Sequence, residues 1–209
     1  MTGSCTPTVF VVDDYEPVRK SICRVLRAAG FLVAAFSSPE QFLAQYDPNV
    51  WGCLVLDVAM PTLNGLEVQD ILAKAGSCLP IIFLSGHAKV PQSVRAIKHG
   101  ASDFLTKPVD DEELLAAVRV AIEKDRTRRQ EQAEVTEVRE RLATLTSRER
   151  EVLEHVVAGK LNKQIAHDLG TVEQTVKVHR ARVMHKMRVQ SVAELVRLIE
   201  RSRRHGSVP

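Results

Sequence analysis

The sequence predicts an α/β domain built on a parallel sheet, followed by a long charged helix and a smaller all-helical domain. Five short apolar runs alternate with helix-like stretches up to residue 122, the pattern of a parallel sheet with helices on both faces. The next stretch, 122–145, is rich in Glu and Arg and contains neither glycine nor proline. Four amphipathic helices follow from Thr146 onward.

Length and charge support two domains. The chain has 209 residues, enough for one large domain or two small ones. Residues 1–120 carry 10 Lys and Arg against 13 Asp and Glu, whereas residues 121–209 carry 19 against 13. An acidic first half and a basic second half indicate different partners, and the basic half favours nucleic acid.

No segment predicts export or membrane insertion. No apolar run reaches the length of a membrane span, and the N-terminus lacks the basic start and apolar stretch of a signal peptide. The four cysteines lie far apart without metal-ligand spacing, which is typical of reduced thiols. We therefore expect a cytoplasmic protein with no membrane partner.

The predicted strands are short apolar runs, which are typical of strands buried on both faces. They lie at residues 8–12, 31–36, 53–56, 81–84 and 103–105. The helices that separate and follow them are expected at residues 16–29, 39–46, 65–75, 90–99 and 110–122. Gly30 follows the first of these helices, where a glycine commonly ends a helix.

The charged stretch carries a short apolar pattern in its second part. Val135, Val138, Leu142 and Leu145 follow one another at 3-4-3 spacing, which is the seam of a short coiled coil. A solvated linker helix is the alternative, and a seam this short does not exclude it.

The start signals of the C-terminal helices recur. Thr146–Glu149, Thr171–Gln174 and Ser191–Glu194 each match the capping box, in which a hydroxyl and an acid or amide pair with free backbone N–H groups. A further helix is expected from Asn162, as its cap, to Gly170, which stops it. Each helix has one apolar face, so the four can form a common core.

Polar residues gather where the predicted strands end. Asp13 and Asp14 follow the first strand, Asp57 the third, Ser85 the fourth and Lys107 the fifth. These ends share the carboxyl edge of a parallel sheet, where such folds bind ligands. Carboxylates together suit Mg²⁺, and a lysine and a hydroxyl suit phosphate oxygens. The set predicts phosphoryl transfer to an aspartate.

Residues 8–122 resemble a response-regulator receiver domain. The motifs are "VVDD", "LDVAMPTLNGLE", "FLSGH" and "DFLTKP". The resemblance implies a flavodoxin-like sheet of order 2-1-3-4-5 and phosphorylation of Asp57 by a sensor histidine kinase. The further roles that it implies are Mg²⁺ ligation by Asp13, Asp14, Asp57 and the backbone carbonyl of Ala59, phosphoryl contact by Ser85 and Lys107, and a switch shared by Ser85 and Phe104.

The segment from about Asn162 to Ala181 predicts a helix-turn-helix, for which plain bundle packing is the alternative. If Val172, Val176, Val183 and Met187 form the core face, the opposite face carries Gln174, Lys177, Val178, Ala181, Arg182 and His185. Val178 suits contact with a thymine methyl group in the major groove. Lys163 is expected at the phosphate backbone, and residues 158–209 hold 11 Lys and Arg against 4 Asp and Glu.

This segment resembles the LuxR-type DNA-binding domain. The similarity covers about residues 140–203, after a receiver at 8–122 and a helical linker at 123–145, so that the whole chain is similar to NarL/FixJ-type regulators. The resemblance implies that Lys177 and Val178 face the bases.

We therefore expect a phosphorylation-dependent transcription factor rather than an enzyme. Its expected partners are a sensor histidine kinase, double-stranded promoter DNA, RNA polymerase and, once phosphorylated, a second copy of the chain. An aspartyl-phosphate hydrolase is the first alternative, but such an enzyme typically has a second acid where this chain has Ala59. A phosphorelay module or RNA-binding antiterminator is disfavoured by the capped helix-turn-helix.

Overall fold

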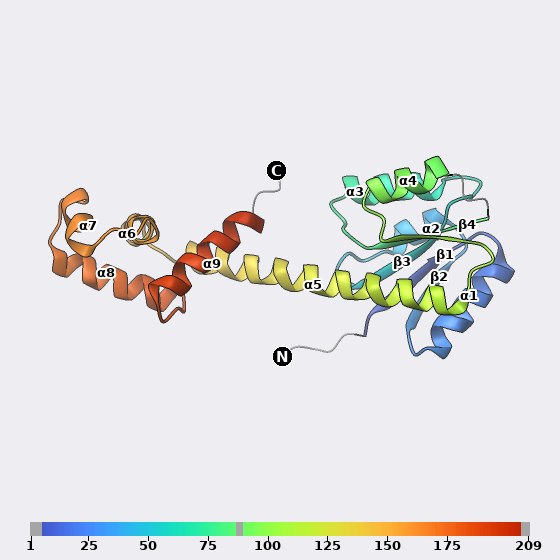
Figure 1. Ribbon diagram of the computed structural model, residues 1–209, viewed down its shortest axis with the longest axis horizontal. Helices are drawn as coiled ribbons and strands as arrows, with labels where there is room; N and C mark the ends of the chain where they lie inside the picture. Colours follow the sequence, from blue (N-terminus) through green and yellow to red (C-terminus); the bar gives the residue numbers. More distant parts are fainter. Residues whose placement is uncertain (1–5, 87–89, 206–209) are drawn as a thin grey trace. The chain divides into compact units, whose positions relative to one another are not determined.

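The computed structural model describes residues 6–86 and 90–205 and divides into two compact units (Figure 1). The first is Met1–Arg128 and the second is Arg129–Pro209. One helix, α5 (Asp111–Ala143), contributes residues to both. Among the described residues, no helix is both long enough and apolar enough to cross a membrane.

The first unit is a five-stranded parallel sheet flanked by helices, in the order β2-β1-β3-β4-β5. This confirms the predicted fold class. The strands are β1 (Thr8–Val12), β2 (Leu32–Phe36), β3 (Gly52–Asp57), β4 (Ile81–Ser85) and β5 (Asp103–Thr106). The helices are α1 (Glu16–Ala28), α2 (Pro39–Gln45), α3 (Gly65–Lys74), α4 (Val90–Lys98) and the first part of α5.

Two apolar cores lie on opposite faces of the sheet because successive strand side chains alternate between faces. Val9 and Val11 of β1 belong to the core that includes residues of α1 and α5. Phe10 and Val12 belong to the core that includes residues of α2, α3 and α4. Every residue of β3 and β4 is buried, as expected for central strands covered on both faces.

The strands extend slightly beyond the apolar runs. Asp57, Ser85 and Thr106 are the last residues of β3, β4 and β5, so Asp57 and Ser85 belong to the strands rather than to the loops that follow them. Gly52 opens β3 with φ +151°, and a Cβ there would lie 1.8 Å from the carbonyl oxygen of Thr8. Only glycine fits this close approach between neighbouring strands.

Asp125 of α5 is fully buried, which the sequence pattern did not indicate. Its Oδ2 accepts the backbone N–H of Gly52 at 3.0 Å, and its Oδ1 lies 2.7 Å from Nη2 of Arg128. Arg128 also donates to the carbonyl of Cys78. These bonds satisfy a buried charge and hold α5 against the amino-terminal edge of the sheet.

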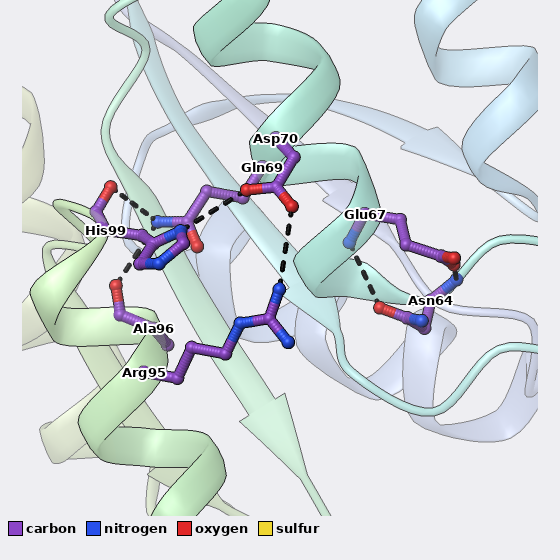
Figure 2. A network of polar contacts seen from close by, with 7 residues as sticks. All are labelled: Asn64, Glu67, Gln69, Asp70, Arg95, Ala96 and His99. Atoms are coloured by element: carbon purple, nitrogen blue, oxygen red, sulfur yellow. Dashed lines mark hydrogen bonds and ion pairs between the residues drawn. The ribbon is translucent and has the colours of Figure 1, made fainter.

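Helices α3 and α4 are joined by polar side chains (Figure 2). Nε2 of buried Gln69 donates to the carbonyls of Ala96 and His99, at 3.3 and 3.1 Å. Asp70 lies 3.7 Å from Nη2 of Arg95 and 3.3 Å from Nδ1 of His99. The Ala96 carbonyl also accepts the N–H of Ala101 at 3.0 Å, so Gln69 adds a second bond there and joins α3 to the end of α4.

The start of α3 is closed by a capping box, also drawn in Figure 2. Oδ1 of Asn64 accepts the N–H of Glu67 at 3.0 Å, and Oε2 of Glu67 accepts the N–H of Asn64 at 2.8 Å. This box fixes where the chain enters α3 after β3.

The second unit packs the end of α5 with four further helices. They are α6 (Ser147–Val157), α7 (Asn162–Asp168), α8 (Glu173–Lys186) and α9 (Val192–His205). Its core contains residues from all five helices, including Val138, Val152, Ile165, Val183 and Leu195. This confirms an all-helical second part with one shared core.

The predicted coiled-coil seam lies inside this unit. Val135, Val138 and Leu145 are buried, and Leu142 packs against the same core. Glu134 forms an ion pair with Arg201 of α9 at 3.2 Å. These side chains are covered by their own chain, so neither the intermolecular seam nor the solvated linker describes them.

Two of the expected helix starts differ in the structure. Thr171–Gln174 forms no cap, because α8 begins at Glu173 and its N-cap is Val172. Instead, the N–H of Thr171 donates to the carbonyl of Ala166 at 2.9 Å and closes the turn that ends α7. Val172 is 66% exposed and is not part of the core. The helical periodicity predicted it on the core face, but Val172 precedes α8 and so does not follow that periodicity.

The start of α7 is also shifted by one residue. Asn162 is its first residue, Leu161 is the N-cap, and Oε1 of Gln164 accepts the N–H of Leu161 at 2.8 Å. At α9, Oγ of Ser191 accepts the N–H of Glu194, whereas the Glu194 carboxylate reaches Gln190.

The box at Thr146–Glu149 is confirmed and includes a buried ion pair. Oγ1 of Thr146 accepts the N–H of Glu149, and Oε2 of Glu149 accepts the N–H of Thr146. Nζ of Lys186 lies 2.6 Å from the same Oε2. Lys186, and after it the backbone of Thr146, lowers the pKa of Glu149 from 4.5 to about 2.

We expect Glu149→Gln to lower the free energy of unfolding by about 1.5–3 kcal/mol at neutral pH, because a charged hydrogen bond is lost. A depressed carboxyl pKa stabilises the fold fully above pH 4.5, and this contribution is lost as the pH falls towards 2. The difference between wild type and variant should shrink over that range. Urea unfolding followed by circular dichroism checks this.

Glu154→Gln on the exposed side of α6 is the matched control and should leave the unfolding free energy unchanged. If the difference in unfolding free energy between wild type and Glu149→Gln stays constant with pH, the Glu149 charge does not have the stabilising role given to it.

Candidate functional site

Three carboxylates meet at the carboxyl edge of the sheet. Asp13 and Asp14 follow β1 and Asp57 ends β3, and each offers an oxygen within 4.8 Å of the others. Asp13 and Asp57 are buried, whereas Asp14 is exposed. The structure thus brings together the three acids that the strand pattern predicts.

Lys107, which follows β5, places its ammonium group among these acids. Its Nζ lies 2.6 Å from Oδ2 of Asp13 and 3.2 Å from Oδ1 of Asp57. The backbone N–H of Lys107 donates to the carbonyl of Ser85 at 2.8 Å, which continues the pairing of β5 with β4. The sheet register therefore determines where the lysine enters the site.

Asp57 lies in a balance of opposing effects. Burial raises the pKa of its carboxyl group, the Lys107 ammonium opposes that rise, and the neighbouring Asp13 carboxylate adds to it. The N–H of Ala59 donates to Oδ1 of Asp57 at 3.4 Å. The contacts from Lys107 and Ala59 both go to Oδ1, and among the described residues Oδ2 has no hydrogen bond.

Ser85 and Phe104 occupy neighbouring strands. Ser85 is buried at the end of β4, and Phe104 is a half-buried residue of β5. The Phe104 ring is tilted against that of Phe83, with 6.2 Å between the centroids. Phe104 therefore packs against the core on the α2–α4 face.

Arg19 is part of the site but was not identified from the sequence. From α1 its Nη1 donates to the carbonyl of Asp13 at 2.6 Å and to that of Asp14 at 3.4 Å. Together with the N–H of Tyr15, which donates to Oδ1 of Asp13 at 2.9 Å, it fixes the β1–α1 loop. The only sequence signal was a cation five residues after an acid pair, and that is too common to be informative.

The acid cluster fits a hard divalent cation. Its ligand atoms are all carboxylate oxygens, the type that Mg²⁺ prefers at about 2.0–2.1 Å. Oxygens within 4.8 Å of one another can therefore share one ion of this kind. The exposed side of Asp14 leaves room for the waters that Mg²⁺ retains.

The second unit presents a polar helix face. Val176, Val183 and Met187 of α8 and the turn after it are buried, and the opposite face is open. All the side chains predicted for this face are exposed, and so is Glu173; the predicted ones are Gln174, Lys177, Val178, Ala181, Arg182 and His185. Val178 is 42% exposed, and Lys163 is exposed near the start of α7.

Two details refine this surface. Arg180 is not on the open face, because its Nη1 donates to Oδ1 of Asn162 at 2.9 Å and so joins α8 to the start of α7. Nζ of Lys177 lies 3.4 Å from Glu173, one turn earlier, in an exposed pair of small expected strength.

Two known families match the two parts of the chain. Residues 9–119 match the family described as response regulator receiver domain. Residues 143–199 match the family described as bacterial regulatory proteins, luxR family.

Similar proteins span almost the full chain. Nodulation protein W of Bradyrhizobium diazoefficiens is 46% identical over 198 residues, which cover 95% of this chain and 87% of that protein. The transcriptional regulatory protein FixJ of Rhizobium meliloti is 44% identical over 192 residues, covering 91% and 94%.

Solved structures agree with these matches. The response regulator StyR superimposes with a TM-score of 0.86 at 42% identity, covering 93% of this chain and 98% of that one. Full-length FixJ from B. japonicum gives 0.59 at 37% identity, covering 97% and 98%. The chain belongs to the FixJ/NarL-type response regulators and combines a receiver domain with a LuxR-type DNA-binding domain.

Proposed function

We propose that this response regulator accepts a phosphoryl group on Asp57 from a sensor histidine kinase and, in that form, controls transcription through DNA contacts made by α8. The observation that carries the proposal is the arrangement around Asp57. Its Oδ1 is held by Lys107 and Ala59, while no hydrogen bond to Oδ2 is found in the described part of the chain. That oxygen is the nucleophile.

In the proposed reaction, Oδ2 of Asp57 forms a bond to the phosphorus atom of a phosphohistidine. The P–N bond breaks, and its electron pair returns to the imidazole nitrogen. Asp13, Asp14, Asp57 and the carbonyl of Ala59 would hold Mg²⁺, which supplies neutralisation of charge on the transferring group.

Lys107 and Ser85 receive the transferred group. The Lys107 ammonium now lies between Asp13 and Asp57, so a phosphoryl oxygen on Asp57 competes with Asp13 for it. The Ser85 hydroxyl, at the end of the adjacent strand, donates to a second phosphoryl oxygen, and Phe104 rearranges with it. The chemistry at Asp57 thereby reaches β4 and β5.

The DNA contacts divide into two kinds. Gln174, Lys177, Val178, Ala181 and Arg182 lie on the open face of α8 and meet base edges in the major groove. Lys163 of α7 meets the phosphate backbone. The helix-turn-helix then extends from about Asn162 to Ala181.

The remaining proposals concern organisation and partners. We assign residues 8–122 to the receiver, 123–145 to a helical linker and 140–203 to the DNA-binding domain, and the part of the linker from Arg129 onward packs with the second unit. The protein acts in the cytoplasm with RNA polymerase as a further partner. It has no turnover on external substrates, because Ala59 stands where a hydrolase would need an acid.

Asp57→Asn should abolish labelling by a small radioactive phosphodonor, because an amide is not a nucleophile, while keeping the fold. Lys107→Ala should still bind Mg²⁺ but should lose the rearrangement of Ser85 and Phe104 that follows phosphorylation. Denaturing gels measure the label, and titration calorimetry with Mg²⁺ measures metal binding. Asp47→Asn, in an exposed loop, is the matched control. Labelling of Asp57→Asn at the level of this control would contradict the assignment of Asp57 as the phosphorylated residue.

Phosphorylation should convert a monomer into a dimer. The expected pairing surface is about residues 89–106 on α4 and β5, of which Lys89 lies outside the described residues. Because Val135, Val138 and Leu145 are buried in their own unit, we do not expect a dimer before phosphorylation. Sedimentation with and without phosphodonor measures this, and equal values would contradict it.

Lys177→Ala and Lys163→Ala should weaken DNA binding in different ways. Loss of a base contact costs about 1–3 kcal/mol on the preferred duplex and relaxes selectivity at one position. Loss of a phosphate contact weakens all duplexes alike and lowers the salt slope by about one. Titration on selected and scrambled duplexes at several salt concentrations separates these effects.

Arg197→Ala, exposed on α9, removes the same charge and should change neither selectivity nor slope. If Lys177→Ala weakens both duplexes equally and lowers the slope, Lys177 is a phosphate contact and not a base contact.

A further inference from the structure

The end of α8 is held by the last turns of α5. The chain leaves α8 through Arg188, whose φ of 54° lies in the left-handed region. The last carbonyls of a helix lack partners within it and carry partial negative charge. Here the carbonyl of Met187 accepts a hydrogen bond from Nη1 of Arg141 at 3.0 Å.

Arg141 is itself fixed in place. Its Nη2 lies 2.6 Å from Oε1 of Glu137, one turn earlier on α5, and its side chain is only 20% exposed. The same Oε1 lies 3.6 Å from Nη1 of Arg188. Glu137 therefore orients the Arg141 guanidinium. It also contacts Arg188, in the turn at the end of α8 that Arg141 holds.

A second contact closes the same junction. Nζ of Lys186, the last residue of α8, donates to the carbonyl of Thr144 at 3.0 Å and to the carboxylate of Glu149 at 2.6 Å. Thr144 directly follows α5, and Glu149 lies in the first turn of α6. The C-terminal end of α8 is thus bound to the connection between α5 and α6.

Glu137 and Arg141 lie before the stretch that matches the luxR family, which begins at residue 143. Arg141 nevertheless reaches 46 positions along the chain to Met187. Val138, on the same turns of α5, belongs to the core of the unit. The last turns of α5 are therefore a structural part of this unit.

We propose that Arg141 is a positioning residue for DNA recognition, which sets the placement of α8 from its C-terminal end. This inference rests on the proposed role of α8 in reading DNA. A helix rises about 1.5 Å per residue, so a small tilt at one end displaces the base-reading residues at the other. Base-edge hydrogen bonds depend steeply on such placement, whereas phosphate attraction does not.

The test uses the full-length protein and a duplex selected from random sequences by the wild type. Arg141→Met keeps the apolar stem but removes both hydrogen bonds. It should lower the preference for the selected over a scrambled duplex by about tenfold, the effect of one lost charged hydrogen bond. The salt slope should stay at its wild-type value, because Arg141 neutralises no phosphate.

Arg141→Lys should restore most of the preference, because an ammonium group can still donate to the Met187 carbonyl. Arg139→Met is the charge-matched control: Arg139 is exposed on α5 and has no hydrogen bond or ion pair to any described residue. It should leave preference and slope unchanged. Hydrogen exchange in full-length Arg141→Met should quicken in peptides covering the end of α8 and not in those covering α6.

If Arg141→Met prefers the selected over the scrambled duplex as strongly as the wild type does, the inference is wrong. Equal weakening on both duplexes with a lower salt slope would also overturn it, by making Arg141 a phosphate contact. If exchange rises throughout the unit, Glu137→Met decides, since it keeps the guanidinium of Arg141 but removes the acceptor that orients it. A folded Glu137→Met with unchanged preference then contradicts the inference.

Failure of the proposed function gives a different result. In that case the wild type itself would show no preference among duplexes, or Lys177→Ala would leave the preference intact. The Arg141 variants bear on the inference once the wild type is selective and Lys177→Ala is less selective than the wild type.

Discussion

The ammonium group of Lys107 is the interaction on which the acidic edge of the receiver depends. Asp13 and Asp57 are both buried, two buried carboxylates side by side repel each other, and the Asp13 carboxylate helps to raise the pKa of Asp57. One Nζ contacts both, at 2.6 and 3.2 Å. The lysine is in place because β5 pairs in register with β4. The charge balance at Asp13 and Asp57 therefore depends on the order of the strands in the sheet.

This constraint explains why so much of the site could be predicted from the sequence. In a parallel sheet, the residue after each strand lies at the same edge, so Asp13, Asp57, Ser85 and Lys107 meet once the strands are identified. Arg19 could not be found in this way, because its place depends on how far a long side chain on α1 reaches. Asp125 was missed for the same reason, since its partner Gly52 is 73 positions away.

Helix ends were the weaker part of the sequence prediction in the second unit. The pattern at Thr171–Gln174 matches a capping box, but the N–H of Thr171 is used to close the turn after α7. The helix period correctly placed Val176, Val183 and Met187 in the core, and it failed for Val172 because that residue precedes α8. The role of α5 was hidden because its partners, Met187 and Arg188, follow it by more than forty positions.

The central claim is that phosphate on Asp57 controls the affinity of the second unit for DNA. The most direct measurement is the dissociation constant for a selected duplex, with and without phosphodonor, in wild type and in Asp57→Asn. The account predicts that the donor tightens binding by the wild type and leaves binding by Asp57→Asn unchanged. Equal tightening in both proteins, or no tightening in a wild type that is fully phosphorylated, would contradict it.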